Sequence, residues 1–286
     1  MSRGSSITVV IPTRGRDAES LSGCLRAVFE QRPFADEVLV VDNGGGAAEA
    51  VVKSFPGARA LREPRIGVHH ARNRGIEEAK GEILLFIDDD IRPEPGWLEA
   101  LAGAFGDPQV LAAGGPIRPD WQEPPPAWVV RNSRVLDLLG LLDLGEQRRD
   151  LDYRREFLVG GNLACRRSAV RGESGFQAVW PCAGLGVIAD DYELSRRLAG
   201  IGRVIYEPRA AVRHLISPRK TRWSHILPRV YAAEAARTAL GGRLSPRRGP
   251  RELLGRDGLL SAAVLLGHLR AVFSASRRNT VIRGHF

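Results

Sequence analysis

The chain has 286 residues, of which 43% are hydrophobic and 26% are charged, so it can form one large α/β domain with an appendage and is not expected to be disordered. Lysine and arginine number 42 against 33 aspartates and glutamates, a net charge of +9, but residues 203–286 alone hold 17 basic and 4 acidic residues and residues 1–202 therefore carry −4. A basic surface attracts phosphates, which belong to nucleic acid, anionic lipid or a phosphorylated small substrate.

The location of the protein is predicted from three features. No run of about eighteen consecutive apolar residues occurs, so we do not expect an integral membrane protein. The short apolar run near the N-terminus lacks a cleavage site of small residues, so we do not expect a signal peptide. The three cysteines, Cys24, Cys165 and Cys182, are odd in number and far apart, which predicts reduced thiols, no zinc site and a cytoplasmic protein.

Short apolar runs alternate with helical patterns in the first part of the chain. Strands that alternate with helices predict βαβ units and a doubly wound sheet. The run before residue 88 is continuously apolar, as in a strand buried on both faces of a parallel sheet. The expected strands cover residues 7–13, 36–43 and 82–90, and the expected helices cover residues 18–31, 46–55 and 67–81.

The second part of the chain is less regular. Residues 116–157 mix prolines, leucines and charges, and we expect a functional excursion rather than a free linker. Residues 157–170 predict a strand that enters a helix through a glycine turn, residues 189–202 a helix, and residues 203–216 a strand. A last amphipathic helix is predicted near residues 252–275.

Polar residues follow three of the expected strands, at the carboxyl ends where ligands bind in such sheets. They are Thr13 and Arg14, Asp42 and Asn43, and the acids at 88–90. Three adjacent carboxylates repel one another, which is tolerated in a solvated turn or cancelled by a divalent cation such as Mg²⁺ or Mn²⁺. Alternation along an extended segment would put Asp88 and Asp90 on one side and Asp89 on the other.

Six motifs in this order resemble the family 2 glycosyltransferases over about residues 6–216. They are "VVIPTRGR", "EVLVVDN", "ARNRGIEEAKGEILLFIDDD", "GGNLACRRS", "ADDYELSRRL" and "VRH". The resemblance implies a GT-A fold, a doubly wound mixed sheet with a C-terminal helical tail, and an inverting, metal-dependent enzyme that uses sugar nucleotides. It also implies a catalytic domain over residues 1–218, with a nucleotide-binding half near 1–115, an acceptor half near 116–218, and a basic loop and helical extension over 219–286.

The same resemblance implies residue roles on the nucleotide side. Pro12, Thr13 and Arg14 would border the nucleobase, and Asp42 would accept a hydrogen bond from the N3–H of a pyrimidine. Arg72 would lie over the nucleotide and Asp88 near the ribose, with Asp89 beside them. Because "NGGG" follows Asp42 in place of the common acidic and serine continuation, the ribose contacts are less well defined.

On the catalytic side, Asp90 and His214 would ligate Mn²⁺ or Mg²⁺ at the diphosphate. Asp191 matches the second acid of the family's usual Glu–Asp pair, the catalytic base, but here the first acid is Asp190, so either carboxylate could be the base. Both aspartates also suit a simple helix N-terminus, which favours ionised carboxylates.

Two further segments are candidate contacts for the diphosphate or the acceptor. Gly160 and Gly161, with Asn162, form a tight turn or allow the backbone to approach a sugar. A basic loop follows His214 and either closes over a phosphate group or forms a solvated surface. Its basic residues are Arg219, Lys220 and Arg222.

The predicted function is therefore hexosyl transfer from a UDP or dTDP sugar to a hydroxyl of a glycan, a lipid-linked glycan or a specialised metabolite. The alternative is a sugar-nucleotide-binding protein of the same fold without turnover. An oxidoreductase is disfavoured because no GxGxxG follows the first strand, and no nucleic-acid-binding motif occurs. The last helix leaves peripheral contact with the inner face of a membrane open; the sequence does not indicate the oligomeric state.

Overall fold

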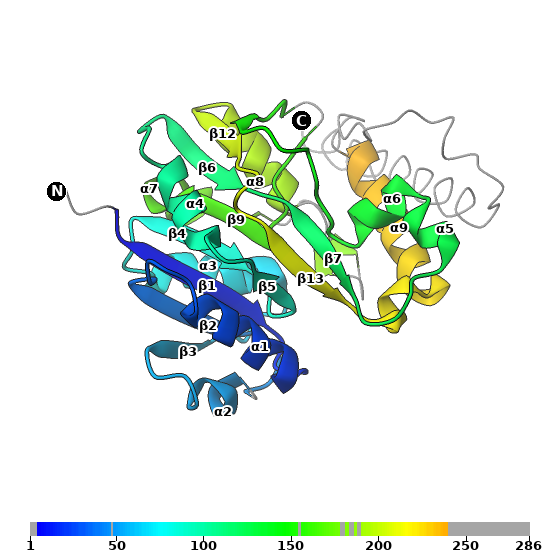
Figure 1. Cartoon of the computed structure of the whole chain (residues 1–286), viewed down its shortest axis with the longest axis horizontal. Helices are drawn as coiled ribbons and strands as arrows, with labels where there is room; N and C mark the ends of the chain where they lie inside the picture. Colours follow the sequence, from blue (N-terminus) through cyan, green and yellow to red (C-terminus); the bar gives the residue numbers. More distant parts are fainter. Residues whose placement is uncertain are drawn as a thin grey trace, which may run out of the picture.

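The computed structural model describes residues 5–239, apart from 47, 154–155, 178–180, 183–185 and 188–189. Its main sheet has eight strands, and Figure 1 shows this sheet running from β3 at the bottom to β12 at the top. In spatial order the strands are β3 (Ala58–Arg62), β2 (Glu37–Asp42), β1 (Ile7–Thr13), β4 (Ile83–Ile87), β9 (Asn162–Arg166), β6 (Val110–Gly114), β12 (Arg203–Tyr206) and β8 (Arg149–Asp150).

The sheet is mixed because one central strand is reversed. β1 pairs in parallel with β2 and β4, and β2 pairs in parallel with β3. β9 runs antiparallel to both of its neighbours, β4 and β6. The strands β1 and β4 are buried throughout, which explains their continuous apolar runs. The predicted doubly wound mixed sheet is confirmed.

Helices pack against this sheet. They are α1 (Ala18–Phe29), α2 (Ala48–Val52), α3 (Val68–Glu78), α4 (Trp97–Ala104), α7 (Arg167–Val170) and α8 (Asp190–Ala199). Asp17 caps α1 by accepting a hydrogen bond from Ser20 N at 3.0 Å. The helix α3 contacts β1 and β2, and a Cβ at Gly75 would lie 2.3 Å from Val10 Cγ1. Only glycine at this position allows so close an approach.

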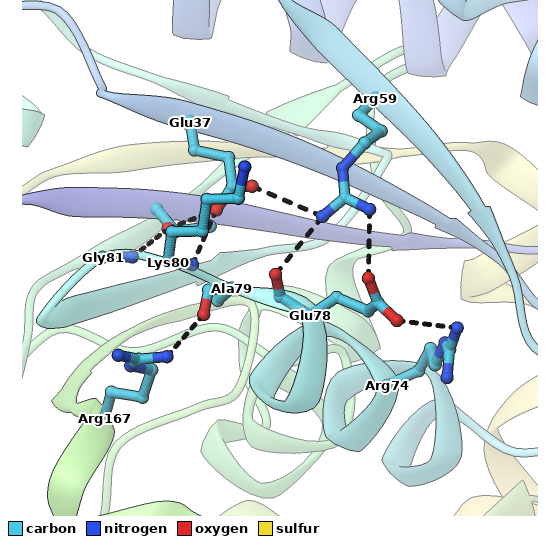
Figure 2. Close-up of polar contacts among 9 residues, drawn as sticks. Glu37, Arg59, Arg74, Glu78, Ala79, Lys80, Gly81 and Arg167 are labelled. Carbon is cyan, nitrogen blue, oxygen red and sulfur yellow. Dashed lines mark hydrogen bonds and ion pairs between the residues drawn. The ribbon is translucent and has the colours of Figure 1, made fainter.

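Polar contacts fix the C-terminal end of α3 to the sheet (Figure 2). Glu37 at the start of β2 accepts hydrogen bonds from Thr8 Oγ1 at 2.8 Å and from Lys80 N at 2.9 Å. Arg59 on β3 joins Glu37 at 3.4 Å to Glu78, at the end of α3, at 3.0 Å. One carboxylate therefore connects three strands to the segment that leads into β4.

A second sheet of three strands lies beyond the end of β4. It consists of β5 (Ile91–Pro93), β13 (Val212–Ile216) and β7 (Ile117–Trp121), with β13 antiparallel to β5 and parallel to β7. Leu215 N donates to Asp90 O at 2.9 Å, which fixes β13 beside the acidic turn. A short hairpin, β10 (Pro181–Cys182) with β11 (Gly186–Val187), precedes α8.

Three helices gather beside the tips of β7 and β13 (Figure 1). They are α5 (Ala127–Val130), α6 (Ser133–Leu138) and α9 (Trp223–Ala239). The rings of Trp128 and Trp223 stack with centroids 4.0 Å apart and an interplanar angle of 4°. The short helix η2 (Pro218–Thr221) joins β13 to α9. The excursion after residue 116 is therefore structured and packs on the C-terminal part of the described chain.

Several sequence predictions of elements need correction. The glycines at 160–161 precede β9 and do not lie between a strand and a helix. Residues 203–216 form two strands, β12 and β13, and β3 was not predicted at all. The predicted helix at 252–275 lies outside the described residues. Among the residues that the structure describes, no helix is long and apolar enough to cross a membrane.

Candidate active site

The acidic residues 88–90 form a turn after β4. Because β4 ends at Ile87, and Ile91 N donates to Asp88 O at 3.1 Å, the alternation of side chains along a strand does not extend to them. Each of the three carboxylates instead contacts different partners. Asp88 faces Arg72, Asp89 faces Thr13, and Asp90 faces Lys220 and His214.

The contact of Asp89 joins this turn to the end of β1. Thr13 Oγ1 donates to Asp89 Oδ2 and accepts a hydrogen bond from Gly15 N at 2.9 Å. Burial raises the pKa of Asp89 to about 7, and the charges of Asp90 and Asp88 add to this rise, whereas the hydrogen bond from Thr13 opposes it. Pro12 and Thr13 are buried. Of the three residues predicted to border a nucleobase, Arg14 is the exposed one.

Asp42 lies at the end of β2 and organises the loop that follows it. Its carboxylate accepts hydrogen bonds from Gly44 N at 2.8 Å, from Gly45 N at 3.0 Å and from Ala48 N at 3.0 Å. Burial alone would raise the pKa of Asp42, but these backbone hydrogen bonds lower it below its usual value. The loop also needs glycine, since a Cβ at Gly44 would lie 1.9 Å from Arg14 O.

Asn43 is a positioning residue to which the sequence analysis assigned no role. Its side-chain amide donates to Glu63 O at 2.9 Å and to Arg65 O at 2.6 Å, and it accepts from Gly67 N at 2.8 Å. These bonds hold the loop that leads into α3 against the end of β2. Its place directly after Asp42, at a strand end, was the available signal.

Arg72 on α3 is the centre of the site. Its Nη1 donates to Asp190 Oδ2 at 3.1 Å and its Nη2 donates to Asp88 Oδ1 at 3.1 Å. The ring of Phe176 lies 5.1 Å from the guanidinium, and Arg72 is 4% exposed. Burial opposes its charge, but the carboxylates of Asp190 and Asp88 raise the pKa of Arg72. The guanidinium therefore lies between two carboxylates, and the predicted place of Arg72 over a nucleotide stays a prediction.

The glycine pair before β9 makes room for this bridge. A Cβ at Gly160 would lie 2.5 Å from the Arg72 guanidinium, and a Cβ at Gly161 would lie 3.0 Å from Asp88 Oδ2. The side chain of Asn162 bonds away from this bridge, into the core of the molecule. It is fully buried, accepts from Trp97 Nε1 at 2.8 Å and donates to Ala210 O at 2.8 Å.

Asp190 and Asp191 begin α8 and have different surroundings. Asp190 is 4% exposed and binds Arg72, and burial raises its pKa against the attraction of that guanidinium. Asp191 is partly exposed and accepts from Gly160 N at 3.0 Å and Tyr192 N at 2.8 Å. Burial, with the adjacent charge of Asp190, raises the pKa of Asp191 to about 6. Of these two aspartates, Asp190 is bonded to a side-chain cation, whereas the hydrogen bonds of Asp191 described here come from backbone N–H groups.

Asp90 and His214 lie side by side, with a lysine ammonium between them. Lys220 Nζ lies 2.5 Å from Asp90 Oδ2 and 2.8 Å from His214 Nε2, and His214 Nε2 lies 3.4 Å from Asp90 Oδ1. Burial alone would raise the pKa of Asp90, but the hydrogen bond and charge of His214 and the charge of Lys220 hold it well below its usual value. Arg219 and Arg222 flank Lys220 and are exposed.

The donor atoms of this pair fit a divalent cation. Carboxylate oxygen and imidazole nitrogen bind Mn²⁺, and Mg²⁺ is commonly held by one or two protein groups together with substrate phosphates. Within the described residues, no three His, Cys, Asp or Glu side chains are grouped to hold a metal ion by themselves. An ion at this pair would therefore need further ligands from water or from a substrate.

The fold and the site together define a class of protein. Polar groups at the carboxyl ends of β1, β2 and β4, in a mixed α/β sheet, are typical of nucleotide-binding folds. The sequence model of glycosyl transferase family 2 matches residues 8–172, more than half of the chain, and the chain belongs to this family.

Characterised relatives are longer than this chain. It is 32% identical over 216 residues to the pre-mycofactocin glycosyltransferase of Mycobacterium tuberculosis, covering 73% of this chain and 42% of that protein. It is 25% identical over 224 residues to the hyaluronan synthase of Streptococcus pyogenes, covering 71% of this chain and 51% of that protein. The chain thus spans about two fifths to one half of the length of these relatives.

Two solved structures share the fold. One is the mannosyltransferase PcManGT from Pyrobaculum calidifontis in complex with GDP-Man and Mn²⁺, with a TM-score of 0.59, 19% identity, and 96% of this chain and 76% of that chain covered. The other is GalNAc-T7 with UDP, GalNAc and Mn²⁺, with a TM-score of 0.55, 16% identity, and coverage of 81% and 48%. The predicted GT-A fold is confirmed by this likeness.

Proposed function

We propose that the protein transfers a sugar from a nucleoside diphosphate to an acceptor hydroxyl with inversion at the sugar carbon. One observation carries the proposal. Arg72 bonds to Asp88, two residues before Asp90, and to Asp190, the neighbour of Asp191. This bridge supports a single site in which one acidic group faces the leaving diphosphate and the other faces the acceptor.

The donor side of the proposal rests on the strand ends. The carboxylate of Asp42 carries a lowered pKa and is therefore an acceptor, as recognition of the N3–H of uracil or thymine requires. UDP and dTDP sugars are the donors that we propose. Of the two solved structures with this fold, one is in complex with GDP-Man and the other with UDP. The preference of this protein for one nucleobase is therefore a property to be measured.

Asp90 and His214 are proposed to hold Mn²⁺ or Mg²⁺ at the diphosphate. When bound, such an ion neutralises charge that develops on the leaving group. Arg219 and Arg222, which are exposed on either side of Lys220, are proposed to contact the diphosphate or a phosphorylated acceptor.

Asp191 is proposed as the catalytic base. It takes the proton of the acceptor hydroxyl as the new bond to the sugar carbon forms and the bond to the diphosphate oxygen breaks. Its raised pKa suits proton uptake, whereas Asp190 is bonded to Arg72. We propose a glycan, a lipid-linked glycan or a small metabolite as the acceptor. We also propose that the protein acts in the cytoplasm, and at the inner face of the membrane if the acceptor is linked to a lipid.

Calorimetric titration with UDP, dTDP and GDP, with Mn²⁺ or with EDTA, tests the donor site. We expect tighter binding of UDP or dTDP with Mn²⁺, and Asp90→Ala should remove the metal-dependent part. Glu146→Ala, a change of an acid whose side chain is 82% exposed and pairs with Arg118 at 3.7 Å, is the control. Equal affinity in Mn²⁺ and EDTA would contradict the metal site. Nucleotide binding without transfer to any acceptor would instead favour a non-catalytic binder.

A further inference from the structure

We infer that Lys220 is an exchangeable internal cation that holds the position between Asp90 and His214 until a divalent ion displaces it. The inference rests on the proposed function, because it concerns the same pair of groups. It adds a conformational change to that site. The binding of the ion frees the Lys220 side chain from Asp90 and His214, and thereby frees the turn η2 from this attachment.

The ammonium of Lys220 is surrounded by polar atoms on several sides, as a small bound cation is. Its Nζ lies 2.5 Å from Asp90 Oδ2 and 2.8 Å from His214 Nε2, and it donates to Leu215 O at 3.1 Å. The ammonium thus contacts the same carboxylate and the same imidazole that are proposed to ligate the ion.

Lysine is rare in this chain, yet the residue between Asp90 and His214 is a lysine. Lys53, Lys80 and Lys220 are the three lysines among 42 basic residues. Arginine, which provides the other basic side chains, has a planar guanidinium with its charge spread over three nitrogens. Lysine has a compact point charge, and it fits between one carboxylate oxygen and one imidazole nitrogen as a metal ion does.

The ammonium and a divalent ion exclude one another. A bound Mg²⁺ lies about 2.0–2.1 Å from its ligand atoms, so an ion on Asp90 and His214 would lie against the ammonium that now contacts the same atoms. Two positive charges at such a distance repel strongly. Lys220 must therefore leave when the ion enters.

Release of Lys220 changes the turn that carries it. The turn η2 has four residues and lies between β13 and α9; Arg219 within it and Arg222 directly after it are exposed. Once the lysine is displaced, the basic side chains of Arg219, Lys220 and Arg222 are all available to the diphosphate. Metal entry and the positive charge that faces the donor are thereby coupled.

Mn²⁺ binding to the full chain without any nucleotide tests the inference, with the signal of free Mn²⁺ followed by electron paramagnetic resonance. We expect Lys220→Met to bind Mn²⁺ roughly tenfold more tightly than the wild type, because the competing cation is gone. Lys53→Met removes the same charge from a lysine whose side chain is 74% exposed and should leave the affinity close to wild type. His214→Ala should abolish this binding in both the wild type and the Lys220→Met protein.

A second measurement uses the wild type alone. An amine-reactive reagent followed by mass spectrometry reports the accessibility of each lysine. Mn²⁺ should increase the labelling of Lys220 several-fold and leave that of Lys53, whose side chain is 74% exposed, unchanged. Unchanged labelling of Lys220, or an equal or weaker Mn²⁺ affinity in Lys220→Met, overturns the inference. Neither readout uses sugar transfer, so an absence of transfer would count against the proposed function alone.

Discussion

At the scale of single residues, Arg72 has the most demanding position in the described chain. Its guanidinium is buried between Asp88 and Asp190, which lie 102 positions apart in the sequence, with Gly160 against one side. A buried charge without a partner is costly, so each member of this group depends on the others. Arg72 therefore positions the acidic groups, and we expect its removal to lower the stability of the fold as well as any catalytic activity.

Replacement of Arg72 by methionine should lower the free energy of unfolding by about 3–5 kcal/mol, because Asp190 is left buried without its cation. Urea denaturation at neutral pH measures this value. Arg74→Met on the same helix is the matched control. Since Arg74 is more exposed and pairs with Glu78 near the surface, it should cost about 1 kcal/mol or less. Similar losses in the two variants would show that Arg72 has no special structural role.

The raised pKa of Asp191 predicts a pH dependence. The carboxyl is protonated below about pH 6 and cannot then accept a proton, so kcat/KM should fall about tenfold per pH unit below that value and level off above it. Burial and, after it, the charge of Asp190 raise this pKa, whereas Arg72 and the N–H groups of Gly160 and Tyr192 lower it. The initial rate of transfer from pH 4.5 to pH 8 measures the profile.

Asp191→Asn identifies the group responsible. Turnover should fall by roughly 10²-fold or more, and the acidic limb near pH 6 should disappear from the residual activity. Nucleotide affinity should stay near that of the wild type. If Asp191→Asn keeps normal turnover while Asp190→Asn abolishes it, the base is the neighbouring aspartate.

At the scale of elements, α3 is fixed at both ends. Its N-terminal side is held by the bonds of Asn43 to the preceding loop, and its C-terminal side by Glu37 and Arg59 (Figure 2). Arg72 lies between these two attachments. The position of the guanidinium, and through it of Asp88 and Asp190, is therefore set by contacts at both ends of α3.

Glu37→Ala should destabilise the protein by about 1–3 kcal/mol, because Thr8 Oγ1 and Lys80 N lose their acceptor. Thermal and urea unfolding measure the loss. Glu49→Ala removes an acid that pairs only at the surface with Lys53, at 3.6 Å, and should change stability by about 0.5 kcal/mol or less. An equally small effect at both positions would mean that the Glu37 contacts do not hold α3.

At the scale of the whole molecule, the sequence was most informative about local pattern. The buried strands β1, β2 and β4 are continuous apolar runs and were predicted, and the polar residues at their ends were grouped for that reason. The strand β3, with the sequence "ARALR", is only partly buried and has no such run. Periodicity indicates a strand without its direction, so the reversal of β9 could not be predicted.

The site shows the same limit. The resemblance predicts Asp90 and His214 at one metal ion and Asp191 at the acceptor, but it does not predict the side chains that bond to them. The bond between Arg72 and Asp190 joins positions 118 residues apart, and the bond between Asp90 and Lys220 joins positions 130 residues apart. Such pairings depend on the packing of several elements, which the spacing of motifs does not encode.

The reversed strand has a consequence for the time at which the protein can complete its sheet. In the described chain β9 is the strand that pairs with both β4 and β6, yet it begins about 75 residues after β4 ends. At a synthesis rate of about 5–20 residues per second, roughly 4–15 s pass between the synthesis of β4 and that of β9, its partner at this edge. During that interval "ILLFI" is an unpaired strand edge of the kind that aggregates, so the nascent chain depends on whatever covers that edge until β9 arrives.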